Sequence, residues 1–182
     1  MARKPRELLD GCSYHVTMRI NNRLFYFENK EAKRIFIEVM KKVERIYKCV
    51  FEIFVLMNNH VHLVIRPQRG NDLPGIMHRL ALTFSKRFNK RFKQTGHVWE
   101  SRYFSRPLKS ILEAESVFRY IAKNPVKAKL VKNPKDWFWS SIAFYERGMS
   151  LFIDRITDEM RAIYEKFSAS KYSFVYENET AQ

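Results

Sequence analysis

The chain has 182 residues, 46% of them hydrophobic and 15% aromatic, which fits a single globular domain with a substantial core and excludes a disordered chain. Its apolar runs are far shorter than the ~20 residues that a membrane-spanning helix needs, and its 2 cysteines are too few for a disulfide framework or a four-cysteine zinc site. An excess of 34 Lys and Arg over 19 Asp and Glu gives a net charge of +15, which favours a polyanionic partner, nucleic acid above all.

The pattern of apolar residues predicts an alternation of strands and helices. Strands are indicated where apolar and polar residues alternate or where β-branched and aromatic residues gather, and helices where apolar residues recur every three or four positions. In chain order we expect a strand at 14–20, a helix at 29–47, strands at 49–57 and 60–66, a helix at 73–92, a loop from 97 into a strand that ends at 108, and a helix at 111–123. The first six elements have the β-α-β-β-α-β order of the ferredoxin-like fold, an α+β domain whose antiparallel sheet carries both helices on one face. The other face is then free to hold a site.

Local signals place the ends of these elements. Asn58-Asn59 is a turn signal between the two strands of the hairpin. Pro107 ends the last strand or leaves it at an edge of the sheet. Because the residue before a proline is disfavoured in helical conformation, we expect the helix at 111–123 to end at Asn124, which precedes Pro125.

No repeat, linker or low-complexity tract divides the chain, so we expect one domain over 1–182. Its core spans about 11–145, and 146–182 form a helical tail with a helix from Asp154 to Phe167. The N-terminal segment is charged and lacks the apolar stretch of a secretory signal. We therefore expect a cytoplasmic protein that does not contact membranes.

Two histidines, His60 and His62, stand at the start of the second hairpin strand. Because side chains alternate along a strand, both point to one face, with Cα atoms roughly 6 to 7 Å apart. Imidazole nitrogen is a common metal ligand, so the pair can converge on one divalent cation or one phosphate. The alternative is a pair of half-buried strand histidines with ordinary hydrogen bonds, and the spacing alone leaves both interpretations open.

The helix at 73–92 carries basic residues away from its apolar stripe. A run of charges is often only a solvated helix face, but no acidic residue occurs between Leu73 and Val98, which favours a phosphate-binding surface. We define the basic surface of this helix as Arg79, Lys86, Arg87, Lys90, Arg91 and Lys93; Lys127 and Lys129 add positive charge after the next helix.

Four motifs, in a fixed order over about residues 14–145, resemble a known family. They are Phe54-Val-Leu-Met-Asn-Asn-His60-Val-His62-Leu-Val-Ile, Gly96-His-Val-Trp-Glu-Ser-Arg-Tyr, Arg119-Tyr120-Ile-Ala-Lys-Asn124-Pro-Val-Lys-Ala and Trp139-Ser-Ser. Any one of them is a weak signal, but together they resemble the single-tyrosine HUH transposases. Within that superfamily the chain looks most like the branch associated with repeated extragenic palindromes.

The resemblance implies a role for each of four residues. His60 and His62 correspond to metal ligands, Tyr120 to the nucleophile, and Asn124 to the polar residue that completes the metal site, where related transposases often have glutamine. Tyr120 and Asn124 share a helix face because they are four residues apart. The implied cofactor is Mg²⁺ or Mn²⁺, and the implied partners are single-stranded DNA and DNA hairpins, bound by a monomer or a homodimer.

The chemistry that the resemblance implies is transesterification on single-stranded DNA. Tyr120 attacks the scissile phosphate next to a palindromic hairpin, leaving a 5′-phosphotyrosine link and a free 3′-hydroxyl. The reverse step joins a different strand without ATP, because the energy of the phosphodiester is kept in the protein link. The alternative for Tyr120 is a core aromatic on an amphipathic helix.

Two other classes of function stay open. His15-Val-Thr17 and His60-Val-His62 together look like the paired strands of two-histidine phosphoesterases, which act on RNA ends or cyclic phosphates, although His62 stands where a hydroxyl residue belongs. A non-catalytic nucleic-acid-binding module would use the same open sheet with aromatic stacking platforms. Metal dependence separates the transposase interpretation from both.

Overall fold

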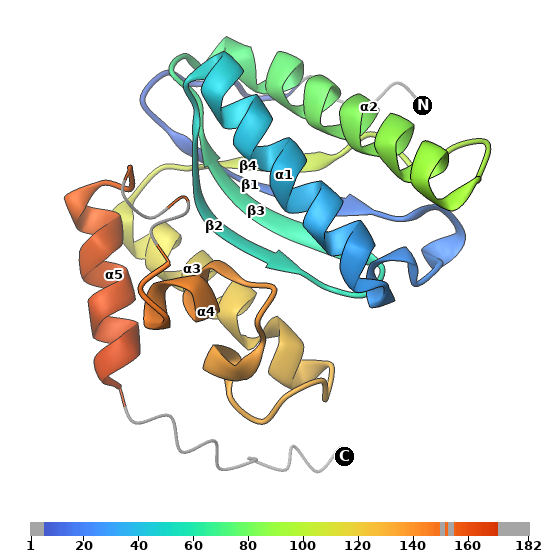
Figure 1. Ribbon diagram of the computed structural model, residues 1–182. Helices are drawn as coiled ribbons and strands as arrows, with labels where there is room; N and C mark the ends of the chain where they lie inside the picture. The colour runs from blue at the N-terminus through green and yellow to red at the C-terminus, as the bar shows by residue number, and fades with distance from the viewer. Residues whose placement is uncertain (1–5, 150–151, 153–154, 171–182) are drawn as a thin grey trace, which may run out of the picture.

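A four-stranded antiparallel sheet organises the computed structural model, which describes residues 6–149, 152 and 155–170 (Figure 1). Neighbouring strands are antiparallel throughout, and the order across the sheet is β2-β3-β1-β4. This is the ferredoxin-like arrangement, so the fold predicted from the order of elements is confirmed. The strands are β1 (Ser13–Arg19), β2 (Val50–Leu56), β3 (His60–Arg66) and β4 (Phe104–Leu108).

Two long helices, α1 (Lys30–Tyr47) and α2 (Leu73–Phe92), cover one face of the sheet. In Figure 1, α1 lies in front of β2 and β3, and α2 runs along the β4 side. Their apolar stripes meet over the sheet, where the rings of Phe36 and Phe84 pack edge to face with centroids 5.2 Å apart. Burying each such ring contributes roughly 1.5–3 kcal/mol, so this aromatic layer stabilises the face away from the histidines.

One basic residue of α1, Lys33, is buried. Lys33 is only 3% exposed, and its Nζ lies 4.6 Å from the ring centroid of Trp137 and 5.6 Å from that of Trp139. Burial lowers the pKa of Lys33 to about 8, because the charged ammonium loses solvation there. The side chain of Lys33 and the indoles of Trp137 and Trp139 thus pack together beside β2.

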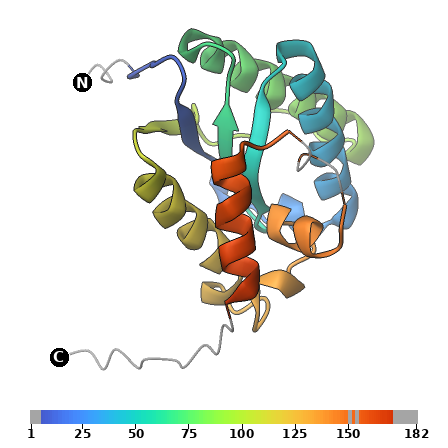
Figure 2. The same ribbon diagram turned by 90° about the vertical axis from the view of Figure 1, so that its left-hand side faces the viewer.

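Three further helices lie on the opposite face of the sheet. They are α3 (Ile111–Lys127), α4 (Ser141–Glu146) and α5 (Asp158–Ala169). Figure 2 shows α5 in front of the sheet, with α3 on one side of it and α4 on the other. The face opposite α1 and α2 is therefore partly covered, and α3 crosses it while contacting both β2 and β4.

The expected end of α3 at Asn124 is wrong, because the helix continues through Pro125 to Lys127. Pro125 sits in the last turn, where few backbone bonds remain to be lost. Ala128 N donates to Asn124 O at 3.0 Å and Leu130 N to Pro125 O at 2.9 Å, so the final carbonyls keep partners. The turn is completed at Lys129, which adopts φ +56°.

Helix α5 packs into the core, although it belongs to the predicted tail. Tyr164 is buried, donates its hydroxyl to Glu52 O at 2.8 Å, and meets the ring of Phe118 edge-on at 4.7 Å. The helix begins at Asp158; the expected start at Asp154 lies outside the described residues. In the part of the chain that the structure describes, no helix is long and apolar enough to cross a membrane.

Candidate active site

His60 and His62 occupy the beginning of β3, directly after the Asn58-Asn59 turn. The turn is closed by Met57 N, which donates to His60 O at 2.9 Å. The two imidazole centroids are 5.0 Å apart and nearly perpendicular. In the antiparallel register Thr17 of β1 stands opposite His62, so the expected common face of the strand histidines and Thr17 is present.

The hydrogen bonds of the two imidazoles engage the same nitrogen in each ring. His60 Nδ1 lies 2.8 Å from Asn59 Oδ1. His62 Nδ1 lies 3.1 Å from Thr17 Oγ1 and 3.2 Å from His15 Nε2. A ligating histidine usually donates its other N–H to such an acceptor, which fixes the tautomer. The Nε2 atoms of His60 and His62 are therefore the nitrogens that remain free to bind a metal ion.

The three histidines are neutral at neutral pH. Burial is the main cause in each case: it lowers the pKa of His15 to about 4, of His60 to about 4 and of His62 to about 3. Nearby positive charge adds to the effect, from Arg106 at His15 and from Arg19 at His60. Neutral imidazole is the form that binds metal, so these nitrogens are prepared to coordinate without first losing a proton.

Tyr120 reaches the same place from α3. Its ring centroid is 5.4 Å from that of His62 and 6.1 Å from that of His15, both edge-on. The side chain is 45% exposed, unlike an aromatic buried in the core. The phenol thus borders the histidines while remaining accessible from solvent.

Asn124 lies one turn after Tyr120 on α3. Its Nδ2 donates to Tyr120 O at 2.8 Å, which orients the amide and leaves Oδ1 as its free acceptor. The amide oxygen is a donor that suits Mg²⁺ or Mn²⁺, whereas imidazole nitrogen favours a transition metal, so of these two ions Mn²⁺ fits the pair of histidines better. Among the described residues, no group of three or more His, Cys, Asp and Glu side chains is arranged to hold a metal. Contacts among the described residues bring together His60, His62 and Tyr120, whereas Asn124 bonds within its own helix, so its role as a metal ligand stays a prediction.

Lys127, one of the basic residues predicted to bind DNA, lies beside Tyr120. Its Nζ lies 5.8 Å from the Tyr120 ring centroid. Lys129 is exposed in the turn that follows α3. Positive charge from the end of α3 thus flanks the phenol.

The basic surface of α2 lies on the other side of the sheet (Figure 1). Two of its residues are ion-paired with α1, Arg87 with Glu38 and Arg91 with Glu31. The inference that acidic partners are missing is therefore wrong for these two, because the partners come from a helix distant in sequence. Within the described residues, the other four form no ion pair: Arg79, Lys86, Lys90 and Lys93.

Sequence reasoning missed two arginines that flank the histidines. Arg19 stands opposite His60 on β1, and Arg106 of β4 stands opposite His15. The alternation of β1 could have placed Arg19 on the face of His15. No local pattern could have placed Arg106, since the register of β4 against β1 is set by long-range packing.

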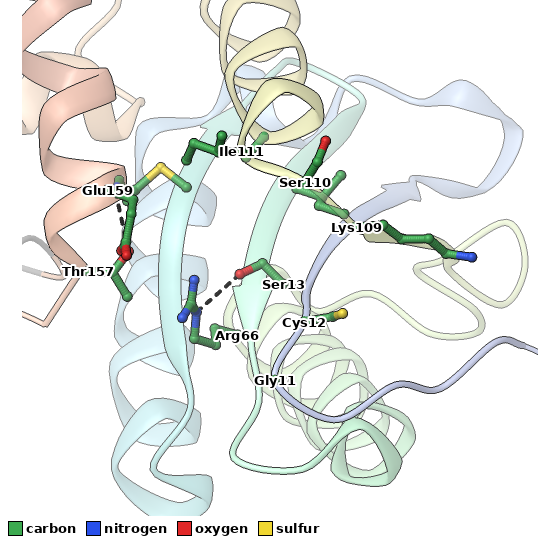
Figure 3. Close-up of a pocket in the computed structure, with 12 residues that line it drawn as sticks. Gly11, Cys12, Ser13, Arg66, Lys109, Ser110, Ile111, Thr157 and Glu159 are labelled. Carbon is green, nitrogen blue, oxygen red and sulfur yellow. Dashed lines mark hydrogen bonds between the residues drawn. The ribbon is translucent and has the colours of Figure 1, made fainter.

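A hollow of about 240 Å³ opens at the start of β1, beside Ser13 (Figure 3). Arg66 projects into it, with Nε 3.2 Å from Ser13 Oγ and 2.8 Å from the buried carboxylate of Glu52. The start of α3 and residues Thr157 and Glu159 complete its wall. The hollow is separate from the histidines and Tyr120, which do not line it.

The chain matches a protein family and is similar to solved structures. Residues 9–124 match the family described as "Transposase IS200 like". The structure of a REP-associated tyrosine transposase bound to a REP hairpin is 20% identical, with a TM-score of 0.69, covering 87% of this chain and 93% of that one. A chain from Deinococcus radiodurans R1 described as a transposase is 17% identical, with a TM-score of 0.46, over 66% of this chain and 95% of that one. No curated protein matches this chain.

Proposed function

Because the chain belongs to the IS200-like transposase family, we propose that it is a metal-dependent endonuclease and strand transferase acting on single-stranded DNA next to palindromic hairpins. One observation carries the proposal: an accessible phenol, Tyr120, stands with its ring centroid 5.4 Å from that of His62, on the face that His62 shares with His60. A nucleophile and two neutral imidazoles thus converge on a face where a strand of DNA can lie.

His60 and His62, through Nε2, together with Asn124 Oδ1, would hold Mg²⁺ or Mn²⁺. The bound ion supplies Lewis-acid polarisation and orientation of the scissile phosphate.

Tyr120 performs the covalent step. Its Oη loses a proton and forms a bond to the scissile phosphorus, and the bond from phosphorus to the 3′-oxygen breaks. The 3′-oxygen takes a proton and leaves as a 3′-hydroxyl, while the protein keeps a 5′-phosphotyrosine link. In the reverse reaction another 3′-hydroxyl displaces Tyr120, so no ATP is consumed.

Hairpin DNA is the partner that we propose for the positive charge. The solved structure with the same fold holds a REP hairpin, and this chain carries a net charge of +15. Lys127 beside Tyr120 would contact the strand being cut, with Lys129 following it. The basic surface of α2 would bind phosphates of the stem, which position DNA without reading its sequence.

The hydrogen bonding of His15 favours this proposal over a two-histidine phosphoesterase. His15 Nε2 lies 3.2 Å from His62 Nδ1, so the two imidazoles are hydrogen-bonded to each other. In a phosphoesterase His15 and His60 would be the acid and base, and His15 Nε2 would be free for the substrate instead of lying against His62.

Replacing the nucleophile tests the proposal. A labelled single-stranded hairpin with a flanking tail is incubated with Mn²⁺ and separated on a denaturing gel. We expect wild type to move label to the mass of the protein and Tyr120→Phe, which keeps the ring, to move none. Tyr47→Phe, on α1 behind the sheet, is the matched control and should behave as wild type. An adduct with Tyr120→Phe would show that another residue is the nucleophile.

A further inference from the structure

The two edges of the sheet differ in how far they are covered beside the histidines. On the β2 side, the chain after α3 closes the edge: Leu56 N donates to Trp139 O at 2.9 Å, and Trp137 Nε1 donates to Leu56 O at 3.1 Å. On the other side β4 is the last strand, and no described strand pairs with its outer edge. A strand leaving the site is therefore directed across β4.

Two exposed side chains of β4 lie on this path. Phe104 stands opposite Thr17, and Arg106 opposite His15; both partners hydrogen-bond to His62. Since directly opposed residues share a face, Phe104 and Arg106 face the same side as the histidines. Phe104 is 60% exposed, and Arg106 is exposed with no ion pair within the described residues.

We propose that Phe104 is a stacking platform for a base of the single-stranded DNA that leaves the active site, and that Arg106 binds a phosphate beside that base. This subsite rests on the proposed function, since it takes the strand held at Tyr120. A single exposed apolar residue is ordinary on a protein surface. Phe104 differs because it lies in the cross-strand row of His62 and Thr17, and near it is Arg106, whose guanidinium forms no ion pair with any residue that the structure describes.

The spacing suits a flanking nucleotide. β4 lies two strands from β3, which places Phe104 roughly 10 Å from His62. That distance corresponds to about three nucleotides at the ~3.4 Å of a stacked strand, and to fewer in an extended one. Beyond β4 the same path leads round the edge toward α2 and its basic surface (Figure 1). Every base has a π-face, so the platform would accept any sequence.

Equilibrium binding without metal tests the subsite apart from catalysis. Fluorescence anisotropy in EDTA measures the affinity for a hairpin with a single-stranded tail. Phe104→Ala should weaken binding about 5- to 150-fold, the usual range for one lost stacking contact, whereas Phe104→Trp should keep it. Phe104→Leu keeps apolar volume without a π-face and should weaken binding as well. Arg106→Gln should lower the salt slope of binding by about 0.7.

An abasic scan of the tail identifies the stacked base. At one position, removing the base should weaken wild type and leave Phe104→Ala unaffected, because the contact is already lost. Phe25→Ala is the matched control: Phe25 is 59% exposed and precedes Tyr26, which stacks on Phe88 of α2. It should show no such coupling.

The outcomes separate the subsite from the proposed function. If wild type forms the Mn²⁺-dependent adduct and the Ala and Leu variants of Phe104 bind like wild type, the platform is wrong and the transesterase stands. If wild type forms no adduct but Phe104 couples to one tail position, the platform stands and the proposed reaction is wrong.

Discussion

The hydrogen bonds at His62 Nδ1 predict how tightly the site binds a metal ion. Thr17 Oγ1 at 3.1 Å and His15 Nε2 at 3.2 Å are two nearly equivalent acceptors for the same N–H. When one acceptor is removed, the N–H of His62 can still bond to the other. Losing one of two equivalent arrangements lowers the affinity for the metal ion by about a factor of two. Removing both leaves the ring without its outer partner, a loss that typically costs about 10- to 100-fold.

The test uses His15→Phe and Thr17→Val, which remove each acceptor while keeping most of the side-chain volume. Mn²⁺ affinity is measured by isothermal titration calorimetry without DNA. We expect about a twofold loss in each single variant and about 10- to 100-fold in the double variant, more than the product of the two single effects. His78→Phe, on the exposed side of α2, is the control. A double variant that binds Mn²⁺ as tightly as wild type would refute the role of these acceptors.

Three other predictions follow from the site and its surroundings. His60→Ala or His62→Ala should abolish the Mg²⁺- or Mn²⁺-dependent adduct, and adduct formation in EDTA would contradict this. His60→Ala should change the melting temperature little because His60 is only partly buried, whereas His62→Ala should lower it, since the 5% exposed ring and its hydrogen bonds are lost. Lys86→Gln with Lys90→Gln should flatten the salt dependence of hairpin binding by about 0.7 to 0.9 per lost contact, and an unchanged slope would make α2 a solvated face. The pKa of Lys33 is lowered to about 8 in the folded protein, so between that pH and about 10.4 the unfolded chain binds more protons than the folded one. The free energy of unfolding of wild type, measured by urea titration, should therefore rise with pH across this window relative to that of Lys33→Met. The same pH dependence in both proteins would refute the burial effect.

The order of the elements was predictable because each carries its own local signal. The local pattern of residues predicts β1 and β3, although both faces of these strands are largely buried, and the three-to-four spacing of apolar residues predicts α1 and α2. The end of α3 was not predictable, because a proline in the last turn removes few backbone hydrogen bonds and Leu130 N still donates to Pro125 O. Boundary signals are weaker than the pattern of burial that they interrupt.

The candidate site was predictable only where its residues share one element. Alternation places His60 and His62 together, and helical spacing does the same for Tyr120 and Asn124. Arg106 and Phe104 meet the histidines only through the register of β4 on β1, which packing of distant segments decides. The pairing of Arg87 with Glu38 is a contact of the same kind, so a stretch without acidic residues does not establish that its charges are unpaired.

The burial of Tyr164 has a consequence for how the two halves of the site could be separated. The sheet carries the imidazoles, while the phenol arrives on α3, whose Phe118 rests on the rings of Tyr164 and Phe167 from α5. The Tyr164 hydroxyl also donates to the Glu52 carbonyl of β2, so α5 links α3, the helix that carries Tyr120, to the sheet. A chain shortened before Asp158 would retain its histidines in register on β3 yet lose the support that aims Tyr120 at them. Loss of α5 would then reduce strand cleavage while leaving metal affinity unchanged.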